Sequence, residues 1–432
     1  MFQPRLQAES ADSDGGDLSC AQGASKRPGS VSRRRKRPAE LAIVLVALLT
    51  GACQDAGESR AHLAVGTFWG GQASQALQRE LIRISRDLGP VSIEVRTFGM
   101  AALNDYLSRP QPLAGRESLD LAIVPHHWLG QLAQRDVIEE LPSERAQVLR
   151  QKLVGQALLA VSDGDRVFGY PISAEVLALV YDPTIFPYPP RTIDEILSTR
   201  FQAGVLPFAL DISSPQALVP LVGSLQGTLI DADGSLVWRP AVVMETLERL
   251  RPVWGSSGGW RAFRGSDLES LQVQLYSAGK LASFVAGPWL LQALEEGGRP
   301  FAVMPIPGFA GAPARARALV GYQCIVVSRG SRWGDLALEV GAQLLREDSS
   351  DRINQATRRL PVLLRAYESK QGLTSAGSFG FLRALEQGQF VPGTPHWAEE
   401  MQKAEQQLEE FASHAQPPAR ARDAARSAGG RP

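Results

Sequence analysis

Short apolar runs alternate with helix-like patterns along most of the chain, and this order predicts an α/β fold. Strands are expected where apolar residues are continuous or alternate with polar ones, at 63–68, 91–98, 119–124, 176–181, 205–210, 281–286 and 319–328. Helices are expected at 73–88, 100–107, 192–199, 215–225, 242–253, 268–278, 335–345, 352–357, 360–367, 381–386 and 395–411. The opening β-α-β-α-β order predicts a mostly parallel sheet with helices outside it.

The N-terminal pattern is different and predicts an export signal. A basic block, SRRRKR at 32–37, precedes the apolar run LAIVLVALL at 41–49 and the small residues before Cys53. Nine apolar residues rise only about 14 Å as a helix, which is too short for a hydrocarbon core of about 30 Å. We therefore interpret residues 1–52 as a signal region. Residues 1–30 are polar and Gly/Ser-rich, so Val31 is the hypothetical true start.

The cysteines refine this interpretation. Small residues directly before Cys53 resemble a bacterial lipobox, which predicts lipidation at Cys53, although Thr50 stands where that motif usually has Leu. The alternative is an ordinary signal peptide with a coincidental cysteine. Cys20 would be removed with the signal, and Cys324 lies in the apolar run CIVV, where a buried strand thiol is expected. No disulfide is expected, and residues 53–60 read as a polar tether.

Composition and charge exclude several classes of protein. The chain has 432 residues, enough for two large lobes. Its 41 Gly and 29 Pro show no period, which excludes a collagen-like chain. The 45 basic and 45 acidic side chains cancel, so no basic field predicts binding to nucleic acid. Residues 415–432, rich in Pro, Ala, Arg and Gly, predict a disordered tail.

Four segments, in order and in register, resemble one known family. They are GYPISAEVLALVYD at 169–182, PYPPRTIDEI at 187–196, YSAGKLASFVAGPW at 276–289 and RLPV at 359–362. All four are similar to the extracellular solute-binding proteins of the maltose/maltodextrin-binding type (family 1), in their lipoprotein form. Those proteins serve ABC importers of sugars, and the resemblance extends from about residue 60 to about residue 412.

The resemblance implies a two-lobed periplasmic-binding-protein fold of type II with three hinge crossings, near 173–175, 319–325 and 371–377. Lobe one would comprise 60–173 and 326–370, and lobe two 176–318 and 378–412. A sugar, from mono- to oligosaccharide, would bind in the cleft between the lobes, and the closed form would dock on an ABC permease. The protein would be an exported monomer, anchored by lipid to a membrane and facing the periplasm or cell exterior. It would be no enzyme and would need no cofactor or metal.

Candidate ligand-binding residues stand where strands end or cross. Trp69 and Gly70 follow the first strand, where an open α/β sheet forms its ligand crevice. The resemblance places Glu175 at the first crossing as a cleft carboxylate. It also places Trp289, after Gly287 and Pro288, where an indole could stack on a sugar ring. The alternatives are core packing for the two indoles and a hinge salt bridge for Glu175.

Four further candidates are expected at cleft depth. His126 and His127 stand where the family has polar ligand contacts, but Trp128 and Leu129 replace the usual Asp-Arg pair. Surface exposure is the alternative for these histidines, and no nearby Cys or carboxylate cluster supports a metal. Tyr322 and Gln323 lie in the second crossing, with hinge packing as the alternative. Residues 211–218 lack the aromatic residues of the maltodextrin type, which favours a shorter or different sugar.

Other functions remain open at this stage. GSSGG at 255–259 fits the G-x-S-x-G pattern of hydrolases, but no apolar strand precedes it and no regular helix follows, so a surface loop is favoured over a lipid-anchored hydrolase. The same fold carries non-sugar solutes such as polyamines, glycerol phosphate or iron in relatives. A degenerate binding protein used as a sensor is the third alternative.

Overall fold

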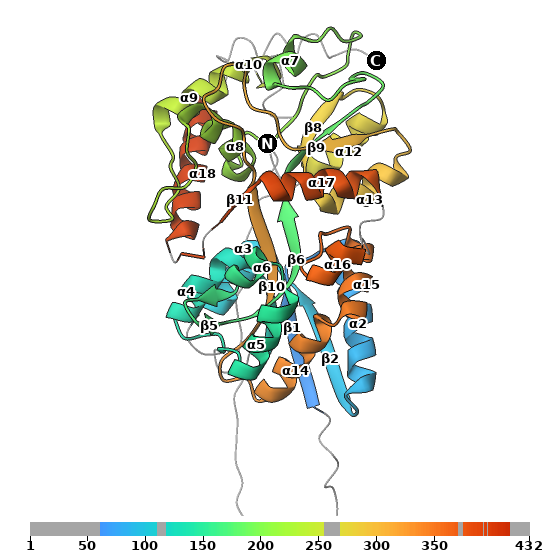
Figure 1. Ribbon diagram of the computed structural model, residues 1–432, viewed down its shortest axis with the longest axis vertical. Coiled ribbons are helices and arrows are strands. Elements are labelled where there is room, and N and C mark those ends of the chain that lie inside the picture. The colour runs from blue at the N-terminus through green and yellow to red at the C-terminus, as the bar shows by residue number, and fades with distance from the viewer. Residues whose placement is uncertain are drawn as a thin grey trace, which may run out of the picture. The chain divides into compact units, whose positions relative to one another are not determined.

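The computed structural model describes residues 61–109, 118–254, 268–369, 375–391, 393–394 and 396–414 (Figure 1). The signal region, Cys53, the tether, the GSSGG segment and the tail from 415 to 432 lie outside these residues, as do residues 371–374 of the third predicted crossing. In the described part of the chain, no helix is both long and apolar enough to cross a membrane.

The described residues form a six-stranded sheet, the larger of the two main sheets. Its strands are β1 (Ala61–Thr67), β2 (Val91–Thr97), β3 (Leu121–Pro125), β6 (Tyr170–Val176), β10 (Leu319–Val327) and β11 (Gln389–Phe390). The order is β11-β10-β3-β1-β2, and β6 also pairs with β10. β1 runs parallel to β2 and β3, as the β-α-β-α-β pattern predicts, whereas β10 runs antiparallel to β3 and β6.

Helices and a small hairpin surround this sheet (Figure 1). They are α2 (Gly71–Asp87), α3 (Met100–Ser108), η1 (His126–Trp128), α4 (Leu129–Gln134), α5 (Ser143–Lys152), α6 (Gly155–Leu159), β4 (Ser162–Asp163), β5 (Arg166–Val167), α14 (Gly334–Leu344), α15 (Glu347–Thr357) and α16 (Leu364–Ser369). In α2 the apolar residues recur at helical spacing, so Leu77, Leu81 and Ile84 are buried on one face. We call the large sheet and these helices lobe one.

A smaller antiparallel sheet has the order β8-β7-β9, with β7 (Ala178–Tyr181), β8 (Ser283–Ala286) and β9 (Ala302–Met304). Around it stand α7 (Ile193–Ser198), α8 (Pro215–Gln226), α9 (Pro240–Arg249), α10 (Arg251–Trp254), α12 (Leu268–Ser277), η2 (Pro288–Leu290), α13 (Leu291–Glu296), α17 (Ala376–Gln387) and α18 (Trp397–His414). We call this group lobe two. Residue 177 alone separates β6 of the large sheet from β7 of the small one.

One expected strand, at residues 205–210, is wrong. The segment makes only isolated parallel bridges, from Leu206 to Leu281 and from Ala209 to Phe284. Pro207 lies between the two bridges, and because proline has no backbone N–H it interrupts a regular ladder there. The strands that were not predicted are β6, β9, β11 and the β4–β5 hairpin, and the helices that were not predicted are α4, α5, α6 and α13.

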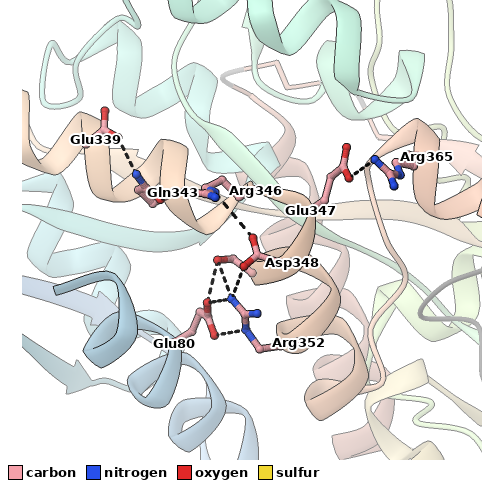
Figure 2. Close-up of polar contacts among 9 residues, drawn as sticks. Glu80, Glu339, Gln343, Arg346, Glu347, Asp348, Arg352 and Arg365 are labelled. Carbon is pink, nitrogen blue, oxygen red and sulfur yellow. Dashed lines mark hydrogen bonds and ion pairs between the residues drawn. The ribbon is translucent and has the colours of Figure 1, made fainter. Parts of the chain in front are cut away.

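An ion pair between a buried glutamate and a partly exposed arginine ties two distant parts of lobe one together (Figure 2). Glu80 of α2 is 3% exposed and accepts hydrogen bonds from Arg352 Nε at 2.8 Å, Arg352 Nη2 at 2.7 Å and Ser349 Oγ at 2.8 Å, both residues of α15. Burial alone would raise the pKa of Glu80, but these partners outweigh it and hold the pKa below the usual value. The returning helix α15 is therefore integral to lobe one.

Candidate functional site

The sharp turn after α15 brings a new residue to the predicted site. Arg358 caps this helix in the left-handed region, with φ of 57°, which is uncommon for a residue other than glycine. The chain then reverses, and Leu360 forms an antiparallel bridge with Ala174 of β6. Antiparallel pairing of 360 with 174 places Arg359 beside Glu175.

Glu175 is the centre of a polar chain at this point. Its Oε1 accepts a hydrogen bond from Arg359 Nε at 2.6 Å, and its Oε2 accepts one from Gln323 Nε2 at 2.7 Å. The side chains of Glu175 and Arg359 are 15% and 10% exposed. Gln323, the neighbour of β6 across the ladder, is buried. Two of the predicted residues therefore lie together, joined to an arginine.

Trp69 lies against the same arginine. The Arg359 guanidinium carbon stands 4.5 Å from the centre of the indole, a cation–π contact. Trp69 is 2% exposed, and its backbone N–H donates to Thr67 Oγ1 at 3.0 Å. Its buried Nε1 has no hydrogen-bond partner among the described residues. Gly70 follows as the exposed N-cap of α2, with open space where a Cβ would be.

Trp289 lies in lobe two and is packed differently. Its indole lies directly on Gly287, where a Cβ would come within 2.1 Å of the ring, so only glycine permits this position. Nε1 of Trp289 donates to Glu269 Oε1 at 2.9 Å. The indole is half-buried and the Glu269 side chain is exposed. This pair is oriented by hydrogen bonding while remaining accessible.

Electrostatics connects the two halves of the site. Glu269 reaches solvent, yet the protein around it removes part of its hydration, and this desolvation raises its pKa, although the Trp289 hydrogen bond and the charge of Arg359 act in the opposite direction. The charges of Glu175 and Asp211 raise it further. Glu269 of lobe two thus experiences the Glu175–Arg359 pair. A direct ion pair also joins the lobes, from Arg358 Nη2 to Glu295 Oε2 of α13 at 2.8 Å.

His126 is buried, and protein groups engage both of its ring nitrogens. Nε2 lies 2.8 Å from the carbonyl oxygen of Val391, and Nδ1 accepts the backbone N–H of Tyr322 at 3.1 Å. Burial lowers the pKa of His126 to about 4, although the bond to the Val391 carbonyl acts in the opposite direction. His127 is half-buried, with its ring perpendicular to those of His126 and Trp128. In this structure His126 offers no free ring nitrogen to a ligand.

Tyr322 and Cys324 face the protein interior. The Tyr322 hydroxyl donates to Gln156 Oε1 at 3.3 Å, and burial raises the pKa of this phenol. Cys324 is a buried free thiol, as predicted, and burial raises its pKa well above the usual value. The Tyr276 hydroxyl donates elsewhere, to the carbonyl of Pro300 at 2.7 Å. Within the described ranges, no group of three or more His, Cys, Asp or Glu could hold a metal ion.

Three polar residues of this site were not among the predicted ligand contacts. They are Arg359, Glu269 and Asp211, whose carboxylate accepts from Ser213 Oγ at 2.6 Å and from the Ser213 N–H at 2.9 Å. Arg359 directly precedes the Leu-Pro turn, which was the one available signal. Glu269 stands near the start of a helix in an undistinguished sequence and gave none.

A separate cavity of about 280 Å³ lies away from these residues. Its walls come from α4, the segment 160–168 with the β4–β5 hairpin, and Gly393 and Thr394. None of the eight predicted ligand-binding residues lines it. It is therefore not the site that the strand ends define.

The two sheets are linked by β6 and β7, which follow each other almost without a break. Aromatic and charged side chains of both lobes lie close enough to influence one another. This arrangement defines a two-lobed α/β binding protein. A model of the family of bacterial extracellular solute-binding proteins matches residues 91–376, and the chain belongs to that family. The resemblance seen in the sequence is thereby confirmed.

Two proteins of known specificity are similar to this chain. A maltotriose-binding protein of Pyrococcus abyssi is 22% identical over 194 residues, 44% of this chain and 42% of that protein. The match thus spans less than half of that relative. A solved structure of a Thermus thermophilus maltotriose binding protein bound with maltotriose superposes with a TM-score of 0.67 at 22% identity, covering 81% of this chain and 98% of the other. The type II two-lobed fold is confirmed.

Proposed function

We propose that this solute-binding protein binds a sugar, from mono- to oligosaccharide, between its two lobes and delivers it to an ABC permease. The observation that carries the proposal is the pair formed by Trp289 and Glu269, a half-buried indole held edge-on to an exposed carboxylate. A sugar presents an apolar ring face and hydroxyl groups, so a flat indole beside a carboxylate acceptor fits both. Maltotriose in the names of two similar proteins supports the same class of ligand.

Glu175, Arg359 and Gln323 would form the lobe-one side of the site. An arginine already held by a carboxylate keeps its remaining N–H groups in fixed directions, and hydroxyl oxygens accept such bonds. We place Gly70 at the rim of this side, with the buried Trp69 packed behind Arg359, and retain His127 as a predicted contact. Tyr322, whose ring is buried and whose hydroxyl is bonded to Gln156, would support the site from within. In this proposal His126 acts through the protein and not on the ligand.

The ligand panel for the test covers the open alternatives. Isothermal titration calorimetry of the full chain would use maltotriose, maltose, glucose, a glycerol phosphate, spermidine and ferric citrate. We expect saturable heat with one sugar class. Saturable heat with spermidine, the phosphate ester or iron alone would replace sugar with that solute. Silence with every compound would favour the degenerate sensor.

Substitution of Trp289 by Ala tests the residue that carries the proposal. We expect the sugar affinity to fall at least about tenfold because the stacking surface is lost. Trp238→Ala is the matched control, since Trp238 is also half-buried and its Nε1 donates to Gln407 Oε1 at 3.0 Å in another part of lobe two. Equal affinities of the two variants would reject the role of Trp289.

Membrane attachment belongs to the proposal as well. The lipobox-like sequence before Cys53 and the family's extracellular description support an exported, lipid-anchored protein. Mass spectrometry of the N-terminal peptide from a bacterial membrane fraction would show a diacylglyceryl cysteine at position 53. A peptide that begins elsewhere and carries no lipid would leave an ordinary signal peptide.

A further inference from the structure

His126 stands where lobe one meets two separate segments of the chain. It follows β3 in η1 and is 0% exposed. Its ring contacts Tyr322 of β10 edge-on, with centroids 5.8 Å apart, and Phe390 of β11 at 5.5 Å. η1 also packs on α18. A single imidazole therefore touches the large sheet and the segment that leads into the last helix of lobe two.

The two hydrogen bonds fix the tautomer of this imidazole. The Tyr322 N–H is a donor, so Nδ1 must accept and carries no proton. The proton of the neutral ring is therefore on Nε2, which donates to the Val391 carbonyl. With a pKa of about 4, the ring is neutral at physiological pH. Nδ1 therefore only accepts a hydrogen bond and Nε2 only donates one, and the two bonds go to different segments of the chain.

The two segments that His126 contacts, at Tyr322 and at Val391, belong to different parts of the fold. The Tyr322 contact lies within the large sheet, because β10 pairs with β3 and β6. Val391 comes directly after β11, which pairs with β10, and its backbone N–H donates to the Val320 carbonyl of β10 at 3.4 Å. Its side chain, however, packs in one cluster with Val219 of α8 and Trp397 of α18. The Nε2 bond therefore holds the point where the large sheet passes into lobe two, whereas the Nδ1 bond anchors the ring within the sheet.

We propose that His126 is a positioning residue that sets the resting angle between the lobes, with Nδ1 as its fixed end and the Nε2–H···O bond to Val391 as the contact that selects the angle. Through this angle His126 controls how closely the Trp289–Glu269 half of the site faces the Glu175–Arg359 half. The ligand would sense His126 only through the fraction of molecules in the binding-competent arrangement. The proposal concerns the lobe angle and holds whichever solute binds.

The two isosteric substitutions separate the two bonds. In His126→Asn the side-chain oxygen takes the place of Nδ1, so the Tyr322 bond is kept and the Val391 bond is lost. In His126→Gln the amide NH₂ reaches the place of Nε2, so the Val391 bond is kept and the Tyr322 bond is lost. A merely structural histidine would respond to both changes alike.

Spin labels on the two lobes measure the angle without any ligand. Cys20 and Cys53 are replaced by Ser, and Glu144→Cys on α5 and Met244→Cys on α9 carry the labels, since both positions are exposed. By pulsed electron–electron double resonance, we expect His126→Gln to keep the parent distance distribution and His126→Asn to add a second population. Identical distributions for all three proteins, or equal shifts in both variants, would overturn the proposal.

A measurement on the unsubstituted side chain keeps the test decisive if a variant does not fold. The chain has five histidines, so ¹⁵N-histidine labelling gives a tractable imidazole spectrum. We expect one ring with a slowly exchanging Nε2 proton and an unprotonated Nδ1 at neutral pH. A spectrum in which every ring exchanges rapidly, or in which the protected ring carries its proton on Nδ1, would contradict the tautomer on which the proposal depends.

Discussion

Trp69 and Trp289 occupy similar places in the sequence and different environments in the structure. Each follows a strand and lies beside a glycine, Trp69 before Gly70 and Trp289 after Gly287 and Pro288. Trp69 is 2% exposed, with Arg359 over its face and its Nε1 unpartnered in the described structure. Trp289 is half-buried, and its Nε1 is hydrogen-bonded to Glu269.

This difference separates two uses of an aromatic residue at a strand end. Trp69 contributes apolar area to the core of lobe one and supports Arg359, so its main effect is on folding. Trp289 has one face against Gly287 and an accessible remainder, so its main effect is on binding. The sequence left a cleft position and core packing open for both indoles, and the burial of each ring favours core packing for Trp69 and the cleft for Trp289.

The largest expected effect is on stability, from Trp69→Ala. Removing a fully buried indole leaves a cavity and should cost about 3–5 kcal/mol of unfolding free energy. Trp289→Ala should cost less than about 1 kcal/mol, because little of its ring is sealed in a core. Urea denaturation followed by circular dichroism measures both values.

Trp69→Phe covers the case in which the alanine variant does not fold. Phenylalanine keeps an aromatic face for Arg359 and removes the buried unpartnered N–H, so its cost should be well below that of alanine. If Trp289→Ala destabilises the protein as much as Trp69→Ala, the division between a folding and a binding tryptophan is wrong.

The next largest effect is expected for the ion pair between Glu175 and Arg359, the arginine that lies over Trp69. Glu175→Gln keeps the shape of the side chain but leaves Arg359 without its carboxylate at 10% exposure, and should cost about 2 kcal/mol. The matched control is Glu245→Gln, which breaks the exposed i,i+4 pair with Arg249 and should cost less than about 0.5 kcal/mol. Urea titrations of both variants at low and high salt provide the comparison. Equal costs would show that the Glu175 pair is no stronger than a surface pair.

The sequence predicted most of the fold because its signals are local. β1, β3 and β10 are apolar runs, and α2 shows its buried face by spacing alone, whereas β6, which carries Glu175, has no such run and was not predicted as a strand. The wrong strand at 205–210 and the missed β9 both lie next to prolines, where a short apolar stretch does not decide the hydrogen bonding.

The site was predictable only in part, for a physical reason. Glu175 and Trp289 could be predicted because each lies within a motif. Arg359 lies 184 residues from Glu175, and only the bridge between Leu360 and Ala174 brings the two together. His126 was expected to contact ligand, but the sequence could not show that Val391, 265 residues away, would accept from its ring. Long-range pairing of this kind leaves no local pattern.

The smallest expected effect is a pH dependence of stability and of sugar affinity. It comes from Glu269, the hydrogen-bond partner of Trp289, and Trp69 has no counterpart to it. Because the pKa of Glu269 is raised, its carboxylate in the folded protein binds a proton at a pH above the ordinary carboxyl pKa of 4.5. The contribution of Glu269 to stability is therefore complete below the pKa of the unfolded chain and is lost as pH rises through the folded pKa. Binding should change in the opposite sense, since protonation removes a carboxylate that accepts sugar hydroxyls.

Calorimetry with maltotriose, as the pH is lowered from 7.5 towards the ordinary carboxyl pKa of 4.5, should show affinity weakening by up to about three- to tenfold, the value of one hydrogen bond. Glu269→Gln should flatten this profile and remove the matching change in the urea midpoint, while Glu245→Gln should leave both as in the parent protein. The urea measurement needs no ligand, so it tests the raised pKa even if maltotriose is not bound. An affinity profile in Glu269→Gln as steep as that of the parent would place the titrating group elsewhere and break the link between Trp289 and its carboxylate.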